Sequence, residues 1–378
     1  MGAREKRIGA VVVLGVWAGA GGCTLLDPLS DLERSGSSSE GGGDGPGAQD
    51  ATDSTQGSDV QSEDAPATSD VPGTSDSPAT TYQRTLTVTA ADALSTGYVV
   101  GFQLDTASLV SQGKMRPDLN DLRVFDPTGA ELDRVVDTGT PSFVWFAITR
   151  AIASGASDTY AAHYGNPSAG AAPANGSAVF SFYDDFTGST LSSQWITLGS
   201  PTVSGGSVRL HAWESDASPD PDSMRTNPQT DEVQAASWLQ IDATVTNPAS
   251  PADAVNGFWY WIGFQRQGDF DASLPWVLWI SRQKNQVQAE DVDVDASFTG
   301  GAVGQDAQQH TYVIARAPTS TTFYRDGMQA YSAPYANTTD YALMLRNYTQ
   351  ASDVVVNLVR DRPLVDNEPT VTVGAEKP

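Results

Sequence analysis

Between residues 82 and 378 the sequence shows no sustained helical period, and this feature constrains the fold more than any other. Short runs rich in Val, Thr, Tyr, Phe and Trp recur instead, and clusters of Gly, Pro, Asn and Asp separate them. Only about one turn near Ser108 has a helical pattern. We therefore predict an all-β fold, and the length is enough for one large or two ordinary domains.

The strand-like runs fall into two groups. A first β-sandwich, 82–170, is predicted from the runs Arg84–Val88, Tyr98–Leu104, Leu122–Phe125, Val144–Ile148 and Thr159–Tyr164. A stretch rich in Gly, Ala, Pro and Ser follows, and we interpret 171–180 as an interdomain linker. A new pattern starts at Phe180 and predicts a second domain, 181–378.

The first group of strands resembles a known family. The motifs are Leu122–Asp126, the turn Gly129–Leu132, the strand Phe143–Phe146, the run Ser157–Tyr160 and the segment Tyr164–Ala169. In this order they resemble the domain of unknown function 2341 over about residues 84–170, and the resemblance implies no activity. Pro167 lacks an N–H donor and keeps Asn166 extended, so this segment predicts the end of a strand.

The second group begins with Phe182–Phe186, Leu191 and Trp195 and closes with Asp353–Arg360 and the strand Thr370–Val373. This frame is similar to concanavalin A-like jelly rolls of the laminin G and glucanase type. The resemblance implies a sandwich of two antiparallel sheets. Within it, the runs Gly257–Gln265, Pro275–Ser281 and Gln286–Val294 predict a meander, and Asp326-Gly327 predicts a tight hairpin.

The first 22 residues predict a signal peptide. Arg4, Lys6 and Arg7 precede the apolar run Ile8–Ala20, which is too short to span a bilayer comfortably. Small residues then lead to Cys23, the only cysteine, and this arrangement resembles the lipobox of bacterial lipoproteins, although that family prefers Leu at the position of Ala20.

The lipobox resemblance implies that Cys23 is lipidated and anchors the chain to the cell envelope. Thr24 follows the cysteine, so the inner-membrane retention that Asp confers is not expected, and we predict the outer membrane. The alternative is an ordinary secreted protein with an incidental cysteine. A lone cysteine forms no disulfide within the chain, so burial must stabilise the folded part.

Residues 23–81 predict a disordered stalk. Residues 24–81 contain 12 acidic residues and one basic residue but few large apolar side chains, so they repel one another and cannot form a core. The rest of the chain, 82–378, has 33 acidic and 17 basic residues. This charge argues against nucleic acid and anionic lipid as partners.

No catalytic residue is assigned from the sequence. Glucanase relatives carry a Glu-x-Asp-x-x-Glu strand, and that motif is missing here. The nearest pattern is Glu290 to Asp295, where a two-residue period places Asp291, Asp293 and Asp295 on one sheet face. We interpret this face as solvated, with an acid/base pair as the alternative. The histidines His163, His211 and His310 lack metal-ligand spacing and read as ordinary strand residues.

Calcium is the one candidate cofactor, and none is required by the sequence. The jelly-roll resemblance implies an acidic ligand near the start of the domain and one on its closing strand, which are Asp185 and Asn357 here. Both offer oxygen ligands suited to a hard cation, although relatives carry Asp at the second position. The alternative for Asp185 is a plain turn residue.

Two runs of aromatic residues are the candidate ligand site. Phe258–Ile262 and Trp276–Ile280 are apolar at consecutive positions, so both faces of these strands must be covered. One face is the core, and the other predicts a groove in which Trp259, Trp261, Trp276 or Trp279 stack on sugar rings. The alternative is that loops or the first domain cover this face.

Together these features predict a lipid-anchored envelope protein with a non-catalytic glycan-binding or adhesion module, whose partner is a polysaccharide or another envelope glycan. Two alternatives stay open, a glycoside hydrolase with an unusual active site and a purely structural envelope protein.

Overall fold

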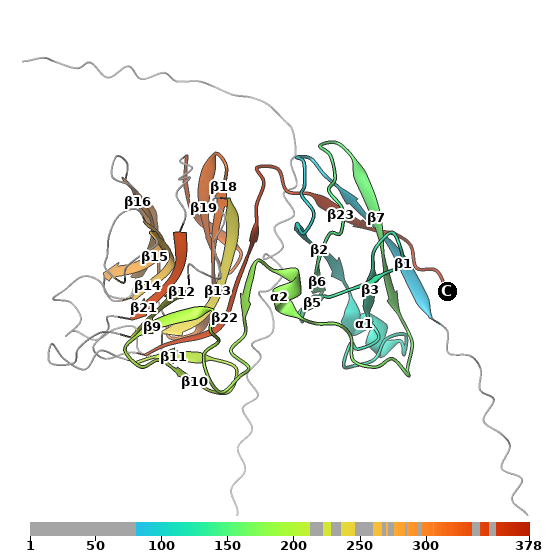
Figure 1. Ribbon diagram of the computed structural model, residues 1–378, viewed down its shortest axis with the longest axis horizontal. Coiled ribbons are helices and arrows are strands. Elements are labelled where there is room, and N and C mark those ends of the chain that lie inside the picture. The colour runs from blue at the N-terminus through green and yellow to red at the C-terminus, as the bar shows by residue number, and fades with distance from the viewer. Residues whose placement is uncertain are drawn as a thin grey trace, which may run out of the picture.

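The computed structural model describes residues 81–211, 222–227, 236–245, 260–266, 270, 276–283, 286–292, 297–304, 306–334, 341–347 and 353–378. The signal peptide, Cys23 and the stalk up to residue 80 lie outside these residues. The predicted all-β class with two β-sandwich domains is confirmed (Figure 1). Neither helix within the described ranges has the length and apolar character needed to cross a membrane.

The first domain packs a five-stranded sheet against a three-stranded sheet. The five-stranded sheet has the order β23 (Thr370–Val373), β1 (Tyr82–Thr89), β7 (Ser157–Tyr164), β3 (Arg123–Phe125) and β4 (Glu131–Leu132). The three-stranded sheet has the order β2 (Val99–Leu104), β6 (Ser142–Ala147) and β5 (Val135–Asp137), and the helix α1 (Thr106–Ser111) follows β2. Alternate residues such as Leu86, Val88, Val144 and Phe146 fill the core between the sheets.

The C-terminal strand corrects one of our predictions. We assigned Thr370–Val373 to the second domain, but β23 pairs antiparallel with β1, with Leu86 opposite Val373 and Thr89 opposite Thr370. A further bridge joins Gln83 to Lys377. The second domain is therefore inserted into the first. The sequence could not show this, because an alternating pattern predicts a strand but not its partner.

The second domain packs two large antiparallel sheets face to face. The inner sheet, which lies nearer the first domain in Figure 1, has the order β10 (Thr202–Val203), β11 (Val208–Leu210), β22 (Val354–Pro363), β13 (Ser237–Val245), β18 (Gln309–Ala317), β19 (Ser320–Arg325) and β20 (Met328–Ala333), and β8 (Phe182–Asp184) also pairs with β22. The outer sheet has the order β17 (Ser297–Gly304), β16 (Gln286–Val292), β15 (Trp276–Gln283), β14 (Tyr260–Arg266), β21 (Tyr341–Asn347), β12 (Ser223–Thr226) and β9 (Trp195–Leu198).

Local sequence signals explain the turns that shape this sandwich. Asp326 and Gly327 connect β19 to β20 with φ of 50° and 76°, which is the left-handed geometry that an Asp-Gly hairpin favours. The helical turn predicted near Ser108 is α1, whose start is capped by Asp105 through its side chain and the Ser108 N–H at 2.9 Å. These local predictions are confirmed.

The segment that we interpreted as a linker is a packed joint between the domains. It contains the short helix α2 (Gly176–Val179), and Val179 and Phe180 are buried against Trp145. The Trp145 ring centroid lies 5.9 Å from that of Trp238 on β13. The Arg360 guanidinium from β22 lies 5.2 Å from the Trp145 ring centroid.

An ion pair fixes the same joint. Arg360 donates to both carboxylate oxygens of Asp137 at 2.9 and 2.7 Å, so β22 of the second domain is bonded to β5 of the first. The first domain therefore covers the inner sheet. The part of our alternative in which the first domain covers the strands that bear Trp261 and Trp276 is therefore wrong, whereas the part in which loops cover them concerns residues outside the described ranges.

Candidate functional site

The candidate site is the outer face, which we define as the side of the outer sheet that points away from the core of the second domain. On β14, Tyr260, Ile262 and Phe264 belong to the core cluster. Trp261, between them in sequence, belongs to a separate cluster with Leu278 and Ile280 of β15. The alternation predicted for this strand is confirmed.

Two tryptophans meet on the outer face. The ring centroids of Trp261 and Trp276 are 6.0 Å apart with an interplanar angle of 33°. Trp261 is 2 % exposed, whereas Trp276 is partly exposed at the margin of the cluster. Trp259 lies outside the described residues. Any ligand that reaches this pair must approach it from the side of Trp276.

Trp279 lies on the opposite side of the sheet. It is fully buried in the core, where its Nε1 donates to the Val313 carbonyl at 3.2 Å and its ring meets that of Phe323 edge-on. Trp276 and Trp279 are three residues apart, and an odd spacing on a strand places two side chains on opposite faces. Trp279 is therefore left out of the candidate site, and the odd spacing could have shown this from the sequence.

Polar and charged side chains share the outer face with the tryptophans. Trp261 pairs with Arg346 on β21, and Leu278 pairs with Glu290 on β16. The Arg346 guanidinium lies 5.7 Å from the Trp261 ring centroid. Among the described residues, the buried polar side chains of this face, each at most 9 % exposed, include Ser223, Arg225, Gln265, Glu290 and Arg346.

Sequence reasoning missed the two arginines of this face. Arg225 pairs with Met344, which in turn pairs with Gly263 between Trp261 and Gln265. Arg225 and Arg346 are thus brought to the aromatic cluster by strands far away in sequence. No local motif signals them, because cross-strand register alone creates the arrangement.

The acidic run on β16 is divided between the two faces. Asp291 is fully buried on the core side, so our interpretation of its face as solvated is wrong for this residue. Glu290 points to the outer face, where the Gln288 amide donates to it at 3.1 Å. Asp293 and Asp295 lie outside the described residues. A glycosidase needs two carboxyl groups about 5 to 10 Å apart on one side, and the described part of β16 provides only Glu290.

Asp185 forms a turn. Its Oδ1 accepts hydrogen bonds from the Thr187 N–H at 3.2 Å and from the Thr187 hydroxyl at 2.9 Å. Asn357 lies in β22 beside a β-bulge, where the pairing with β13 shifts between Asp242 and Ala243. Calcium takes six to eight oxygen ligands, and the described residues contain no group of three or more His, Cys, Asp or Glu side chains that could hold a metal. The local geometry supports the turn reading of Asp185.

Two of the histidines bind carboxylates. His211 Nδ1 lies 2.7 Å from Asp222 Oδ2, and His310 lies 2.7 Å from Asp326 and 2.8 Å from Asp306. The hydrogen bonds to Asp326 and Asp306 outweigh the effect of burial and raise the pKa of His310. The third, His163, packs its ring against Phe125, and burial lowers its pKa. The three residues are dispersed over the two domains.

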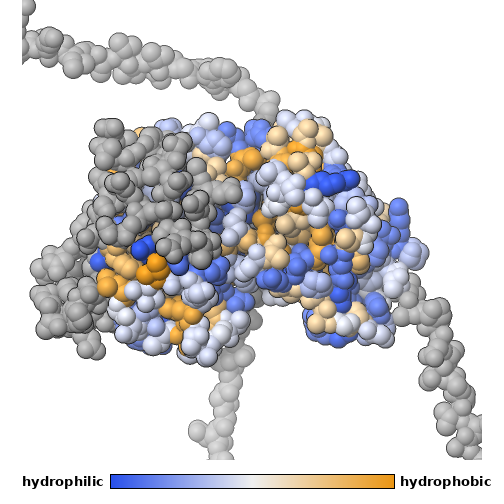
Figure 2. Space-filling view, in the orientation of Figure 1, coloured by the Kyte–Doolittle hydropathy of each residue, from blue (hydrophilic) through white to orange (hydrophobic). Residues whose placement is uncertain are grey.

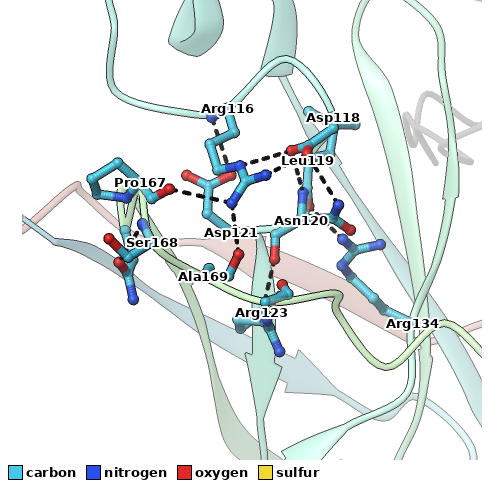
Figure 3. Close-up of polar contacts among 12 residues, drawn as sticks. Arg116, Asp118, Leu119, Asn120, Asp121, Arg123, Arg134, Pro167, Ser168 and Ala169 are labelled. Carbon is cyan, nitrogen blue, oxygen red and sulfur yellow. Dashed lines mark hydrogen bonds and ion pairs between the residues drawn. The ribbon is translucent and has the colours of Figure 1, made fainter.

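A second polar network, in the first domain, holds the segment after β7 (Figure 3). Arg116 donates to the carbonyls of Pro167 and Ala169 at 3.2 and 2.6 Å. The Asp121 carboxylate accepts from the N–H groups of Arg116 and Gly165 at 3.1 and 2.9 Å. These bonds tie the chain down where the strand ends, so the segment acts as the strand stop that we predicted.

Apart from the pocket described below, the described part of the surface offers little else that suggests a ligand site by composition. On the face drawn in Figure 2, apolar residues are scattered among hydrophilic ones and do not form one broad patch. Among the described residues, Met328 is the one large hydrophobic side chain that is well exposed, at 65 %. Single exposed apolar residues are normal on soluble proteins.

Solved structures of carbohydrate-active proteins resemble about half of the chain. A structure described with endo-acting O-glycanases of the human gut microbiota shares 13 % identity and a TM-score of 0.40, covering 49 % of this chain and 99 % of its own. A β-glucanase of Bacillus licheniformis shares 16 % identity and a TM-score of 0.37, covering 48 % and 98 %. An endo-β-1,3-glucanase of Pyrococcus furiosus shares 11 % identity and a TM-score of 0.39, covering 51 % and 94 %.

No curated protein matches the sequence. A family model does match part of it, over residues 118–198. The matched segment starts and ends later than the 84–170 that we assigned to the resemblance, and it includes α2, β8 and β9 as well as Trp145 and Phe180 of the domain joint. The family that this segment matches is the Domain of unknown function (DUF2341).

Proposed function

We propose that the chain is a lipid-anchored cell-envelope protein whose second domain binds a polysaccharide on the outer face without cleaving it. The observation that carries the proposal is the composition of that face. It combines the Trp261 and Trp276 rings with buried Arg225, Glu290 and Arg346 on the side of the sheet that does not form the core.

The physical argument concerns the cost of those polar groups. Even where buried charged side chains are paired, well-packed apolar residues would often serve stability as well or better. Aromatic rings beside side chains that hydrogen-bond are also what a polyhydroxylated ligand requires, since a sugar has both apolar ring faces and polar hydroxyls. This combination supports a binding role over a purely mechanical one.

A structural role of the same face is the second candidate. It is favoured by the burial of Trp261, Leu278 and Ile280, which are at most 2 % exposed. The two candidates differ in the expected behaviour of Trp276, which is partly exposed. In a binding site this ring contacts the ligand, whereas in a structural face it contributes only packing.

The test compares Trp276→Ala with wild type in the full chain. We expect the variant to lose retention on immobilised polysaccharides, with a melting temperature close to that of wild type because the ring is only partly buried. Trp195→Ala, in the core of the same domain, is the matched control for loss of folding. Retention that is unchanged in folded Trp276→Ala, or absent from wild type across a panel of neutral and acidic polysaccharides, would contradict the proposal.

The anchor is tested separately. The argument for it is the basic start, the apolar run and the small residues before Cys23. We expect Cys23→Ala to release soluble protein, and Cys23→Ser serves as a second variant with a side chain of similar size. If either variant partitions into detergent as wild type does, Cys23 is not the anchor.

A further inference from the structure

The first domain has a pocket of about 410 Å³ with both polar and apolar residues in its lining, and it is remote from the outer face. Its lining comes from β1, β2, α1 and β23 and from residues close to them. The return of β23 to the first domain completes its wall, to which Val373 and Glu376 belong. Its volume lies within the range of small-ligand sites.

Three donors in this region converge on one carboxylate of the protein itself. Lys114 forms an ion pair with Glu376, and the Tyr164 hydroxyl donates to Glu376 at 2.7 Å. Arg84 lies 3.6 Å from Glu376 and also donates to the Tyr164 hydroxyl at 2.9 Å. The hydrogen bonds from Lys114 and Tyr164 lower the pKa of Glu376, so this side chain stays ionised.

The rest of the pocket is suited to hydroxyl groups. Gln103, Ser108 and Gln112 line it with amide and hydroxyl groups, of which the Gln112 amide donates to the Ser108 hydroxyl at 2.8 Å. Asp105 adds a carboxylate, one oxygen of which accepts from the Ser108 N–H. The apolar lining is limited to Leu104, Leu109 and Val373. A pocket with a cationic end and a hydrogen-bonding body matches a ligand with one carboxylate and several hydroxyls.

We propose that this pocket binds an acidic sugar of the uronic acid class, and that Glu376 occupies the carboxylate position in the free protein. The ligand carboxylate takes the place of Glu376 at Lys114 and Arg84, so both cations keep a carboxylate partner while the Glu376 side chain turns away from them. The sugar hydroxyls then meet Gln103, Ser108 and Gln112. The site does not depend on the glycan-binding role of the outer face.

In this proposal, Glu376 competes with the ligand carboxylate for Lys114 and Arg84. A group held on the same chain acts at an effective concentration in the millimolar range, so it weakens the apparent affinity for a free carboxylate. Removing its charge frees Lys114 and Arg84 for the ligand. We therefore expect glucuronate to bind Glu376→Gln at least about tenfold more tightly than wild type.

The experiment titrates the full chain with glucuronate, glucose and acetate at constant ionic strength, by calorimetry or NMR. Glucuronate should saturate Glu376→Gln, glucose should bind much more weakly, and acetate should bind weakly because it lacks the hydroxyls. Lys114→Gln in the same background should abolish glucuronate binding. Glu376→Asp keeps the charge on a shorter side chain, so we expect its glucuronate affinity to lie between those of wild type and Glu376→Gln. This second variant tests the proposal even if Glu376→Gln folds poorly.

Equal glucuronate affinity in wild type, Glu376→Gln and Glu376→Asp would overturn the proposal, as would the absence of saturable binding in all three. Acetate that binds as tightly as glucuronate would overturn the assignment to a sugar. Glucose that binds as tightly would overturn the role of Lys114 and Arg84.

Discussion

The second domain carries arginine and tryptophan on both of its sides that point away from the core, but the two sides differ in what covers them. The docked face, which we define as the side of the inner sheet toward the first domain, presents Trp238, Arg360 and Arg362 to Trp145. The outer face presents Trp261, Trp276, Arg225 and Arg346 on the far side of the sandwich.

On the docked face, the arginine and tryptophan side chains have a known partner, which is the first domain. Arg360 contacts Asp137, Gln240 and three aromatic rings, and Arg362 binds Glu368 and stacks on Trp145 and Trp238. Every element of the joint comes from the chain itself. The comparison teaches that arginine and tryptophan on a sheet face predict a contact, while the partner must be identified from the tertiary structure.

The largest effect is expected at the core between these faces. Trp279→Ala should lower the free energy of unfolding by about 3 to 5 kcal/mol, the usual loss for a large aromatic side chain in a core. Trp276→Ala should cost clearly less because its ring is partly exposed. Urea denaturation of both variants measures the difference. Equal losses would mean that the two rings are equivalent structural residues and would remove the contrast between core and outer face.

The next prediction compares the loss of stability when an arginine is removed from the docked face and from the outer face. Arg360→Ala removes one partner of a buried ion pair and should cost about 3 kcal/mol, whereas Arg209→Ala, at an exposed pair with Asp353, should cost less than about 1 kcal/mol. Arg346→Ala should fall between them and should also weaken polysaccharide retention. If Arg346→Ala destabilises as much as Arg360→Ala without changing retention, the outer face is a structural joint like the docked face.

A pH-dependent effect is expected on the core side of the strand that bears the docked-face arginines. Burial raises the pKa of Asp361 to about 8, while Ser237, Arg316 and Arg362 oppose the shift. An unfolded Asp titrates near 3.9, so the folded state binds the proton more tightly. The stabilisation is full below that pH and is lost as the pH rises through about 8.

Asp361→Asn should therefore flatten the fall in unfolding free energy between pH 5 and pH 9, as measured by urea titrations at both values. Glu368→Gln, which changes a partly exposed carboxylate at the same joint, is the control. If the unfolding free energies of wild type and Asp361→Asn change by the same amount between pH 5 and pH 9, Asp361 does not titrate in this range.

The smallest effect concerns His310, near the start of β18 in the inner sheet. Its pKa is raised by Asp326 and Asp306 in spite of burial. Because the folded pKa exceeds the unfolded value near 6.5, the stabilisation is present below that pH and is lost as the pH rises through the folded pKa. His310→Asn should reduce this dependence in melting curves between pH 5 and pH 8. A variant with the same pH profile as wild type would exclude His310 as its source.

Short-range signals in the sequence determined the local structure. Strands β1, β2, β3, β6 and β7, the Asp-Gly hairpin at Asp326 and the strand stop after Tyr164 follow from residue type and from positions close in sequence. The alternation of Tyr260, Trp261 and Ile262 between the core and the outer face follows from the two-residue period of a strand. These features need no knowledge of distant residues.

The tertiary structure alone decided which distant segments meet. It paired Thr370–Val373 with β1 and packed Phe180 of the apparent linker against Trp145. It also placed Arg346 opposite Trp261 and Arg225 on the same face of the sheet. The physical reason is that apolar burial and strand pairing are not specific to one partner in the sequence. Each strand can satisfy its hydrogen bonds with several others, and the choice is made by the packing of the whole chain.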